Sequence, residues 1–225
     1  RSPLQVRVPD RAEPPASAVV TAADLTESSA SAPPPVPAHT ALREGLRRIV
    51  HAGSGLVGLV ALKLPGCGGD VLFGALVVLA LSVEAARRFS PAVQRLVLGA
   101  GGSLFRPEEI HGLSGPTVLA CGYALAWWVF AAPVALAAVL VTALADPAAA
   151  VVGRRFGGGA RKSWAGSAAC AAMAAAVLGA VGVPAPAVLV TTCVAALAER
   201  VAWSRVDNLL LPLSVGATLT LLGPR

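Results

Sequence analysis

One aspartate and the basic segment that follows it have the residue types best suited to chemistry in this chain. Asp146 ends a long apolar run, and the next residues combine four glycines with four cations, Arg154, Arg155, Arg161 and Lys162. Glycines let backbone N–H groups approach phosphate oxygens, and arginine forks match the geometry of those oxygens. Acids can hold divalent cations. The pattern therefore indicates a site where a carboxylate meets a phosphate group.

The position of Asp146 within an apolar run needs an explanation. A carboxylate inside a membrane costs about 2.5–3.5 kcal/mol on insertion scales, and such residues usually belong to a site. Pro147 follows it and cannot donate a backbone hydrogen bond. We therefore predict a discontinuous helix with Asp146 at the break. The alternative is a kinked helix in which Asp146 pairs with a neighbouring arginine.

A second polar group lies near the start of the apolar part of the chain. Glu44, Arg47, Arg48 and His51 are three or four residues apart, which places them on one face of a helix. This face is either an anion-binding stripe that enters the membrane or an interfacial helix start with snorkelling arginines.

Further carboxylates occur in two later connections. Glu108 and Glu109 follow Arg106, and Glu199 precedes Asp207 and Asn208. Paired carboxylates supply the oxygen ligands that divalent metals prefer. Two other interpretations stay open, namely a solvated loop for the first pair and a helix cap for Asp207.

Composition places these groups in a membrane protein. The chain has 225 residues, of which 56% are hydrophobic and 13% charged, and its mean hydropathy is +0.72. Several apolar runs approach the roughly 20 residues that span a bilayer. The net charge of +6 comes mostly from short loops between these runs, which is a topology signal and no indication of nucleic-acid binding.

The chain divides into a tail and a membrane part. Residues 1–42 are rich in Pro, Ala and Ser and lack a sustained apolar period, which favours a disordered tail. Residues 43–225 form the predicted membrane domain, an all-α transmembrane bundle of about seven spans. The predicted runs are residues 49–64, 71–86, 117–131, 134–152, 164–183, 185–198 and 209–222.

The distribution of cations predicts the orientation. With seven spans, the arginines and lysines after the tail lie on one side, except Lys63 and Arg225. The positive-inside rule then places the N-terminus in the cytoplasm. Most of the acids lie near the same face, although acids contribute little to orientation. We therefore expect a polar site that opens to the cytoplasm.

Several motifs together resemble the dolichol kinase and phytol kinase family, over the part of the chain from Glu44 to the C-terminus. The resemblance rests on their order and spacing. The motifs are Glu44-x-x-Arg47-Arg48-x-x-His51, Glu84, Arg106-x-x-Glu109 with Leu113-Ser114-Gly115, Asp146-x-x-Ala149-x3-Gly153-Arg154-Arg155-Phe156-Gly157, Lys162-Ser163-x-x-Gly166-Ser167, and Glu199-x7-Asp207-Asn208-x3-Pro212.

The resemblance implies a polytopic membrane enzyme that phosphorylates a lipid alcohol, using CTP or a related nucleotide with Mg²⁺ or Mn²⁺. We predict catalytic roles for Asp146, Asp207 and Glu109, and metal binding by Asp146, Glu199 and Asp207. The predicted nucleotide-binding residues are Arg106, Arg155, Lys162, Ser163, Gly153, Gly157 and Asn208. The expected location is a bacterial inner membrane, with the site facing the cytoplasm.

Other functions remain open at this stage. A CTP-dependent diacylglycerol kinase is the nearest alternative, because that activity occurs in relatives of the same motifs. A phosphatidate cytidylyltransferase and a membrane transporter with a broken helix at its midplane rank lower. The sequence indicates neither the particular alcohol, such as phytol, geranylgeraniol or a polyprenol, nor the oligomeric state.

Overall fold

The computed structural model describes residues 38–101, 105, 109, 112–157, 162–201 and 207–223. All regular secondary structure in these residues is helical, which confirms the all-α prediction for them. The chain divides into two units, Arg1–Pro37 and Ala38–Arg225. The first unit lies outside the described residues, so the predicted disordered tail is not tested. In the second unit, the first helix begins four residues before the predicted domain boundary at residue 42.

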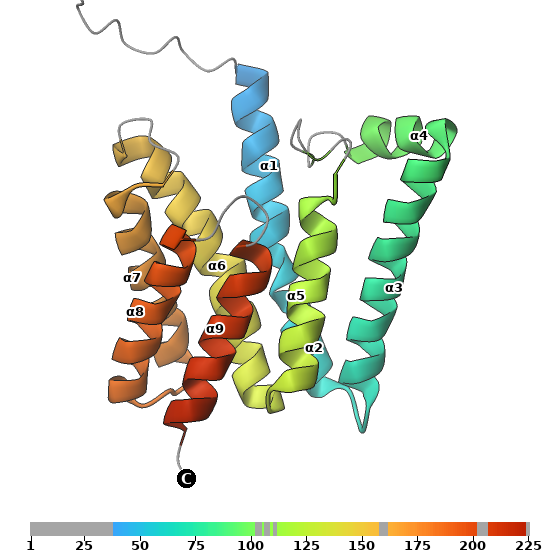
Figure 1. The fold of residues 1–225 in the computed structure, drawn as a ribbon. Helices are drawn as coiled ribbons and strands as arrows, with labels where there is room; N and C mark the ends of the chain where they lie inside the picture. The colour runs from blue at the N-terminus through green and yellow to red at the C-terminus, as the bar shows by residue number, and fades with distance from the viewer. Residues whose placement is uncertain are drawn as a thin grey trace, which may run out of the picture. The chain divides into compact units, whose positions relative to one another are not determined.

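The helices follow the predicted apolar runs closely, with two additions. The first run is divided between two helices at Gly55, and an extra helix lies in the connection after the second run. The helices are α1 (Ala38–Ser54), α2 (Leu56–Lys63), α3 (Gly68–Phe89), α4 (Pro91–Gly101), α5 (Gly115–Val129), α6 (Ala132–Phe156), α7 (Trp164–Ala180), α8 (Ala185–Val201) and α9 (Asp207–Leu222). In Figure 1, α3 and α5 to α9 run in alternating directions, and α4 lies across the end of α3.

Helix α6 is the centre of this unit. It packs against α7 and α9 on one side and against α1, α2 and α5 on the other. Its alanines and valines belong to two hydrophobic clusters, one shared with α7, α8 and α9 and one shared with α2, α3 and α5. Small side chains let helices approach closely, so the chain can bring its polar residues on several helices near the same part of α6.

The predicted break at Asp146 is wrong, because α6 continues through Pro147 to Phe156 as one helix. Proline removes a single intrahelical hydrogen bond, and the neighbouring alanines have the highest helix propensity. The helix also packs on both sides, which adds tertiary stabilisation that the local sequence does not reveal. Asp146 therefore lies on a continuous helical surface.

Two close contacts in the fold depend on glycine. A Cβ atom on Gly122 of α5 would lie 2.2 Å from the carbonyl oxygen of Asn208, at the start of α9. A Cβ atom on Gly55 would lie 2.9 Å from the Cβ of Ala143 on α6. These glycines let α9 and the junction of α1 and α2 pack directly on their neighbours, and so they fix the ends of helices that carry polar residues.

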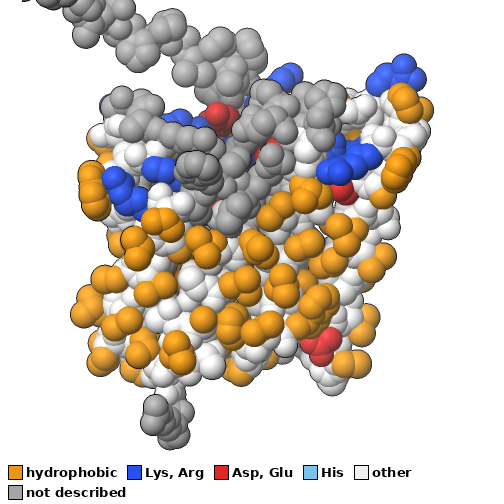
Figure 2. Space-filling model, viewed as in Figure 1, with side chains coloured by type: hydrophobic (Ala, Val, Ile, Leu, Met, Phe, Trp, Pro, Cys, Tyr) orange, Lys and Arg blue, Asp and Glu red, His pale blue; other side chains and the backbone are white. Residues whose placement is uncertain are grey.

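Two described helices, α3 and α6, are long and apolar enough to be candidate membrane-spanning helices. They differ in their surroundings, since 56% of the apolar window of α6 is buried inside the molecule but only 17% of that of α3. Helices α7 and α9 are apolar but shorter. Figure 2 shows hydrophobic side chains distributed over the lower part of the visible surface, whereas most charged side chains gather near the upper end of the view.

Candidate functional site

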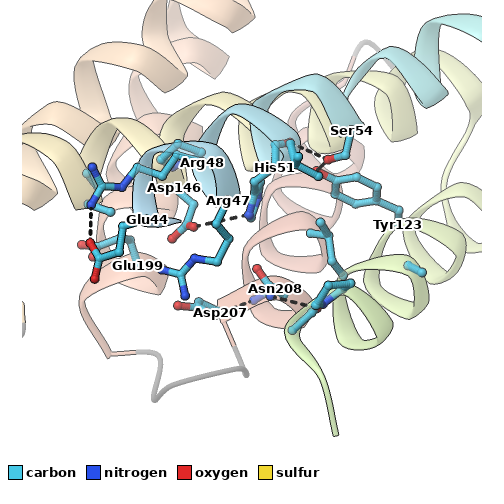
Figure 3. A pocket seen from close by; sticks show the side chains of 18 of the residues that line it. Glu44, Arg47, Arg48, His51, Ser54, Tyr123, Asp146, Glu199, Asp207 and Asn208 are labelled. Carbon is cyan, nitrogen blue, oxygen red and sulfur yellow. Dashed lines mark hydrogen bonds and ion pairs between the residues drawn. The ribbon is translucent and has the colours of Figure 1, made fainter. Parts of the chain in front are cut away.

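A single pocket of about 680 Å³ brings most of the predicted site residues together. Its walls come from α1, α2, α3, α5 and α6, and from the ends of α7, α8 and α9. Figure 3 shows side chains from several of these helices converging on it. The predicted residues that line it are Glu109, Asp146, Gly153, Lys162, Ser163, Glu199, Asp207 and Asn208.

The polar face of α1 forms one wall of the pocket. Glu44, Arg47, Arg48 and His51 all line it, as their helical spacing predicts. The Arg48 guanidinium donates to Glu44 at 3.0 Å, and Arg154 from α6 also forms an ion pair with Glu44. Cations from two helices thus meet at one carboxylate. The stripe therefore lines the pocket, and its binding of an anion stays a prediction.

Asp146 lies beside this wall, on α6. One of its carboxylate oxygens is 3.8 Å from Nδ1 of His51, and its side chain is 25% exposed. The guanidinium of Arg48, on the same wall, interacts electrostatically with the Asp146 carboxylate. Asp146 is therefore accessible from the pocket and lies in the field of an imidazole and a guanidinium.

A hydroxyl pair lies next to His51. The oxygens of Ser54 and Tyr123 are 3.1 Å apart, and Ser54 also donates to the His51 carbonyl oxygen. Both residues line the pocket, although Tyr123 is almost fully buried. This pair joins α1 to α5 where the charged part of the pocket meets its apolar part.

Lys162 is held between two of the predicted carboxylates. Its ammonium is 2.8 Å from Glu199 at the end of α8 and 3.9 Å from Asp207 at the start of α9. The second oxygen of Glu199 accepts a hydrogen bond of 3.0 Å from the hydroxyl of Ser167. Because both oxygens of the buried Glu199 side chain are engaged, its geometry suits the positioning of Lys162 better than direct metal binding.

Ser163 and two glycines shape the connection between α6 and α7. The Ser163 hydroxyl caps α7 by accepting from the N–H of Gly166 at 3.1 Å. A Cβ atom on Gly153 would lie 3.1 Å from this hydroxyl, and one on Gly157 would lie 2.5 Å from the Ser163 Cβ. These glycines permit close packing, and Gly153 alone of the two lines the pocket.

Asn208 and Glu109 are held against the start of α5. The Asn208 amide donates to the carbonyl oxygen of Gly115 at 3.3 Å, and the Asp207 carboxylate accepts from the Asn208 N–H. Glu109 is only 2% exposed and packs on Gly115. The start of α5 therefore orients two predicted residues that are 99 positions apart in the sequence.

A separate buried ion pair fixes the segment before α5. The Glu84 carboxylate accepts hydrogen bonds from Arg87, at 2.6 Å, and from Arg88. It also accepts from the backbone N–H of Ser114 and from the hydroxyl of Thr117. Arg87 donates to the Gly112 carbonyl. This network ties α3 to the beginning of α5 outside the pocket, so it accounts for Glu84 as a positioning residue.

Two predicted phosphate-binding arginines are not among the residues that the structure places at the pocket. Arg106 lies outside the described residues. Arg155 does not line the pocket, and its exposed guanidinium lies 5.4 Å from the Phe156 ring, so its contact with a nucleotide stays a prediction that this geometry does not support. Its neighbour Arg154 does line the pocket. One face of the unbroken helix carries the lining residues Asp146, Ala150, Gly153 and Arg154. Arg155 is rotated about 100° around the helix axis from Arg154, because each residue of a helix is rotated by that angle from the one before.

The described residues contain no group of three or more His, Cys, Asp or Glu side chains close enough to hold a metal ion by themselves. Mg²⁺ does not need such a group, since it usually binds one or two carboxylates together with substrate phosphates and water. Asp146 and Asp207 line the same pocket and fit this requirement. The predicted third ligand, Glu199, is already bonded to Lys162 and Ser167.

The sequence prediction missed the apolar wall of the pocket. This wall is formed by side chains of α2, α3 and α5, and isolated apolar residues in apolar helices give no signal that distinguishes a ligand site from a lipid-facing or core face. Its main residues are Val57, Phe73, Leu76, Leu79, Ala80, Leu119 and Ala120.

Comparisons of the chain with protein-family models, curated proteins and solved structures found no match.

Proposed function

We propose that this chain is a membrane phosphotransferase that moves a phosphoryl group from CTP to the hydroxyl of an isoprenoid alcohol. One observation carries the proposal, namely that carboxylates, cations and an apolar wall line the same pocket. Phosphoryl transfer depends mostly on positioning and on neutralising charge, which are the tasks that such side chains perform. An apolar wall beside the charged groups suits an acceptor with a long hydrocarbon chain.

Asp146 is the proposed base. In the reaction the alcohol oxygen attacks the terminal phosphorus of CTP, the bond to the bridging oxygen breaks, and CDP leaves. The alcohol proton passes to the Asp146 carboxylate, which is accessible from the pocket and 3.8 Å from His51. Base catalysis of this kind contributes about 10²–10⁴-fold. Arg48, Arg154 and Lys162 bind the phosphate oxygens.

A divalent metal, Mg²⁺ or Mn²⁺, would be held by Asp146 and Asp207 and by the nucleotide itself. When bound, it neutralises charge on the phosphate oxygens. Lys162 lies 3.9 Å from Asp207 and so supplies a second positive charge beside the same carboxylate.

The proposed setting is a membrane crossed seven times, once by α1 and α2 together and once each by α3 and α5 to α9. The alternating directions of these helices in Figure 1 support this arrangement. Arginines at the ends of α3, α6 and α8 lie at the same end as the pocket residues Lys162 and Asp207, which by the positive-inside rule is the cytoplasmic end. The N-terminus is then cytoplasmic, and we place the protein in a bacterial inner membrane.

The decisive assay incubates purified protein in nanodiscs with CTP labelled on its terminal phosphate and with geranylgeraniol, phytol, a polyprenol or diacylglycerol. We expect labelled lipid phosphate from an isoprenoid alcohol, with CTP preferred over ATP and with no product after chelation of divalent cations. Product from diacylglycerol alone identifies the nearest alternative, and CDP-lipid formation from phosphatidate identifies a cytidylyltransferase. Transport of lipid without any nucleotide would contradict the proposal.

Adjacent arginines on α6 provide an internal test of the nucleotide site. Arg154→Gln removes a cation that lines the pocket, and we expect it to raise the KM for CTP about 10–100-fold, the equivalent of one charged hydrogen bond of about 1.5–3 kcal/mol. Arg155→Gln removes a positive charge one residue later and outside the pocket, so the KM of this variant for CTP should stay within about threefold of the wild-type value. Equal effects of the two substitutions would show that net charge, rather than the pocket, determines CTP binding.

A further inference from the structure

Part of the pocket wall, here called the apolar arm, is lined by apolar side chains alone. Three helices contribute to it, namely α2 with Val57, α3 with Phe73, Leu76, Leu79 and Ala80, and α5 with Leu119 and Ala120. The hydroxyl pair of Ser54 and Tyr123 lies where this arm meets the charged part. Because the arm and the charged residues line the same pocket, a ligand that fills both parts needs a polar head joined to an apolar chain.

Exposed apolar residues of α1 and α3 belong to the pocket wall. Val50 of α1 and Leu79 of α3 both line the pocket, yet they are 50% and 61% exposed. In the described residues, α1 packs mainly on α6, while α3 packs on α5, α4 and α2, so the two helices have no extensive contact with each other. Their neighbours in the sequence, Ile49 and Val78, are also exposed and apolar.

The exposed faces of these helices determine which phase this part of the wall meets. Helix α3 is one of the two candidate membrane-spanning helices, and it is the one whose apolar residues are mostly exposed rather than packed inside the molecule. Exposed Val71, Val78, Leu79 and Leu81 are distributed along it. An apolar surface of this kind is stable against lipid chains. This part of the wall therefore lies on a surface suited to hydrocarbon rather than to water.

We infer that the gap between α1 and α3 is a lateral entrance through which the chain of a lipid alcohol enters from the bilayer. The hydroxyl reaches Asp146 and His51, the first part of the chain lies along Leu76, Leu79 and Leu119, and the remainder stays in the membrane. The inference rests on the proposed function for the identity of the head group. It adds the entry route and predicts that chains longer than the arm are accepted about equally, since their ends never enter the protein.

A photocrosslinking experiment tests the entrance without requiring turnover. Benzoylphenylalanine is introduced at Leu79 or at Val78, and each full-length protein is placed in phosphatidylcholine nanodiscs with tritiated geranylgeraniol. Both positions are exposed to similar extents, at 61% and 65%, but only Leu79 lines the pocket. At Leu79, we expect the ratio of alcohol crosslinks to phospholipid crosslinks to exceed the molar ratio of the two lipids in the nanodisc at least fivefold. At Val78, the ratio of crosslinks should equal that molar ratio. Equal ratios at both positions would overturn the inference.

Filling the arm gives a second measurement. Leu79→Trp should lower turnover of geranylgeraniol at least tenfold and leave the KM for CTP unchanged, whereas Val78→Trp should change neither. If crosslinking at Leu79 is enriched but no alcohol is phosphorylated, the entrance stands and the proposed kinase function fails. If phosphorylation proceeds without enrichment at Leu79 and tolerates Leu79→Trp, the kinase stands and this entrance is wrong.

Discussion

Asp146→Asn should give a protein that folds normally and transfers phosphate at least about 100-fold more slowly, the scale of a lost base or charge-stabilising group. The substitution keeps the shape of the side chain and removes its charge. Because Asp146 is on an apolar helix, loss of the charge lowers rather than raises the cost of membrane insertion. Yield, gel-filtration profile and thermal unfolding should therefore match the wild type, while the rate with CTP and geranylgeraniol falls.

The control for this experiment is Asp70→Asn. Asp70 is an exposed acid in the first turn of α3 and does not line the pocket, so its removal should leave the rate within about twofold. An Asp146→Asn protein that is well folded and fully active would contradict the assignment of the base. Loss of folding with retained specific activity would instead assign Asp146 to the structure, as a partner of His51 and the neighbouring arginines.

The helices could be predicted from hydropathy because each apolar run is long and bounded by glycine, proline or charge. The points at which a helix divides or continues were harder to predict. The first run divides between α1 and α2 at Gly55, where a Cβ atom would lie 2.9 Å from that of Ala143, a residue 88 positions later in the sequence. Pro147 gave the opposite error, since the local rule predicts a break and the packing of α6 on both sides keeps the helix continuous. Neither of these contacts between distant segments can be predicted from the local sequence.

The charged half of the site could be predicted because buried or paired ionisable groups are costly and therefore informative wherever they occur. The choice between Arg154 and Arg155 could not, because it depends on the phase of α6, and the predicted break at Asp146 hid that phase. The apolar half was invisible for another reason. Leu76 and Leu79 resemble the other leucines of an apolar helix, and only the packing of α3 with the other helices makes them part of the pocket.

Lys162→Met should combine a functional loss with a smaller structural one. The ammonium is 2.8 Å from Glu199 and 3.9 Å from Asp207, so its removal deletes the charge that we propose binds phosphate and leaves these two carboxylates without their shared cation. We expect kcat/KM for CTP to fall about 100-fold, as for a lost charge-stabilising group. Because Lys162 is 25% exposed, the free energy of unfolding should fall by less than the roughly 3–5 kcal/mol of a fully buried pair.

Glu199→Gln separates these two effects. The amide oxygen can still accept from Lys162, and the amide N–H can donate to the Ser167 hydroxyl. If Glu199 only positions Lys162, this variant should therefore lose about tenfold or less in rate and keep the Mg²⁺ concentration for half-maximal activity. In the double variant Lys162→Met with Glu199→Gln, the unpaired buried charge is gone, so stability should return toward the wild type while the 100-fold loss in kcat/KM remains. A large rise in the Mg²⁺ requirement of Glu199→Gln would instead make Glu199 a metal ligand. Recovery of activity in the double variant would show that Lys162 acts on the fold rather than on the nucleotide.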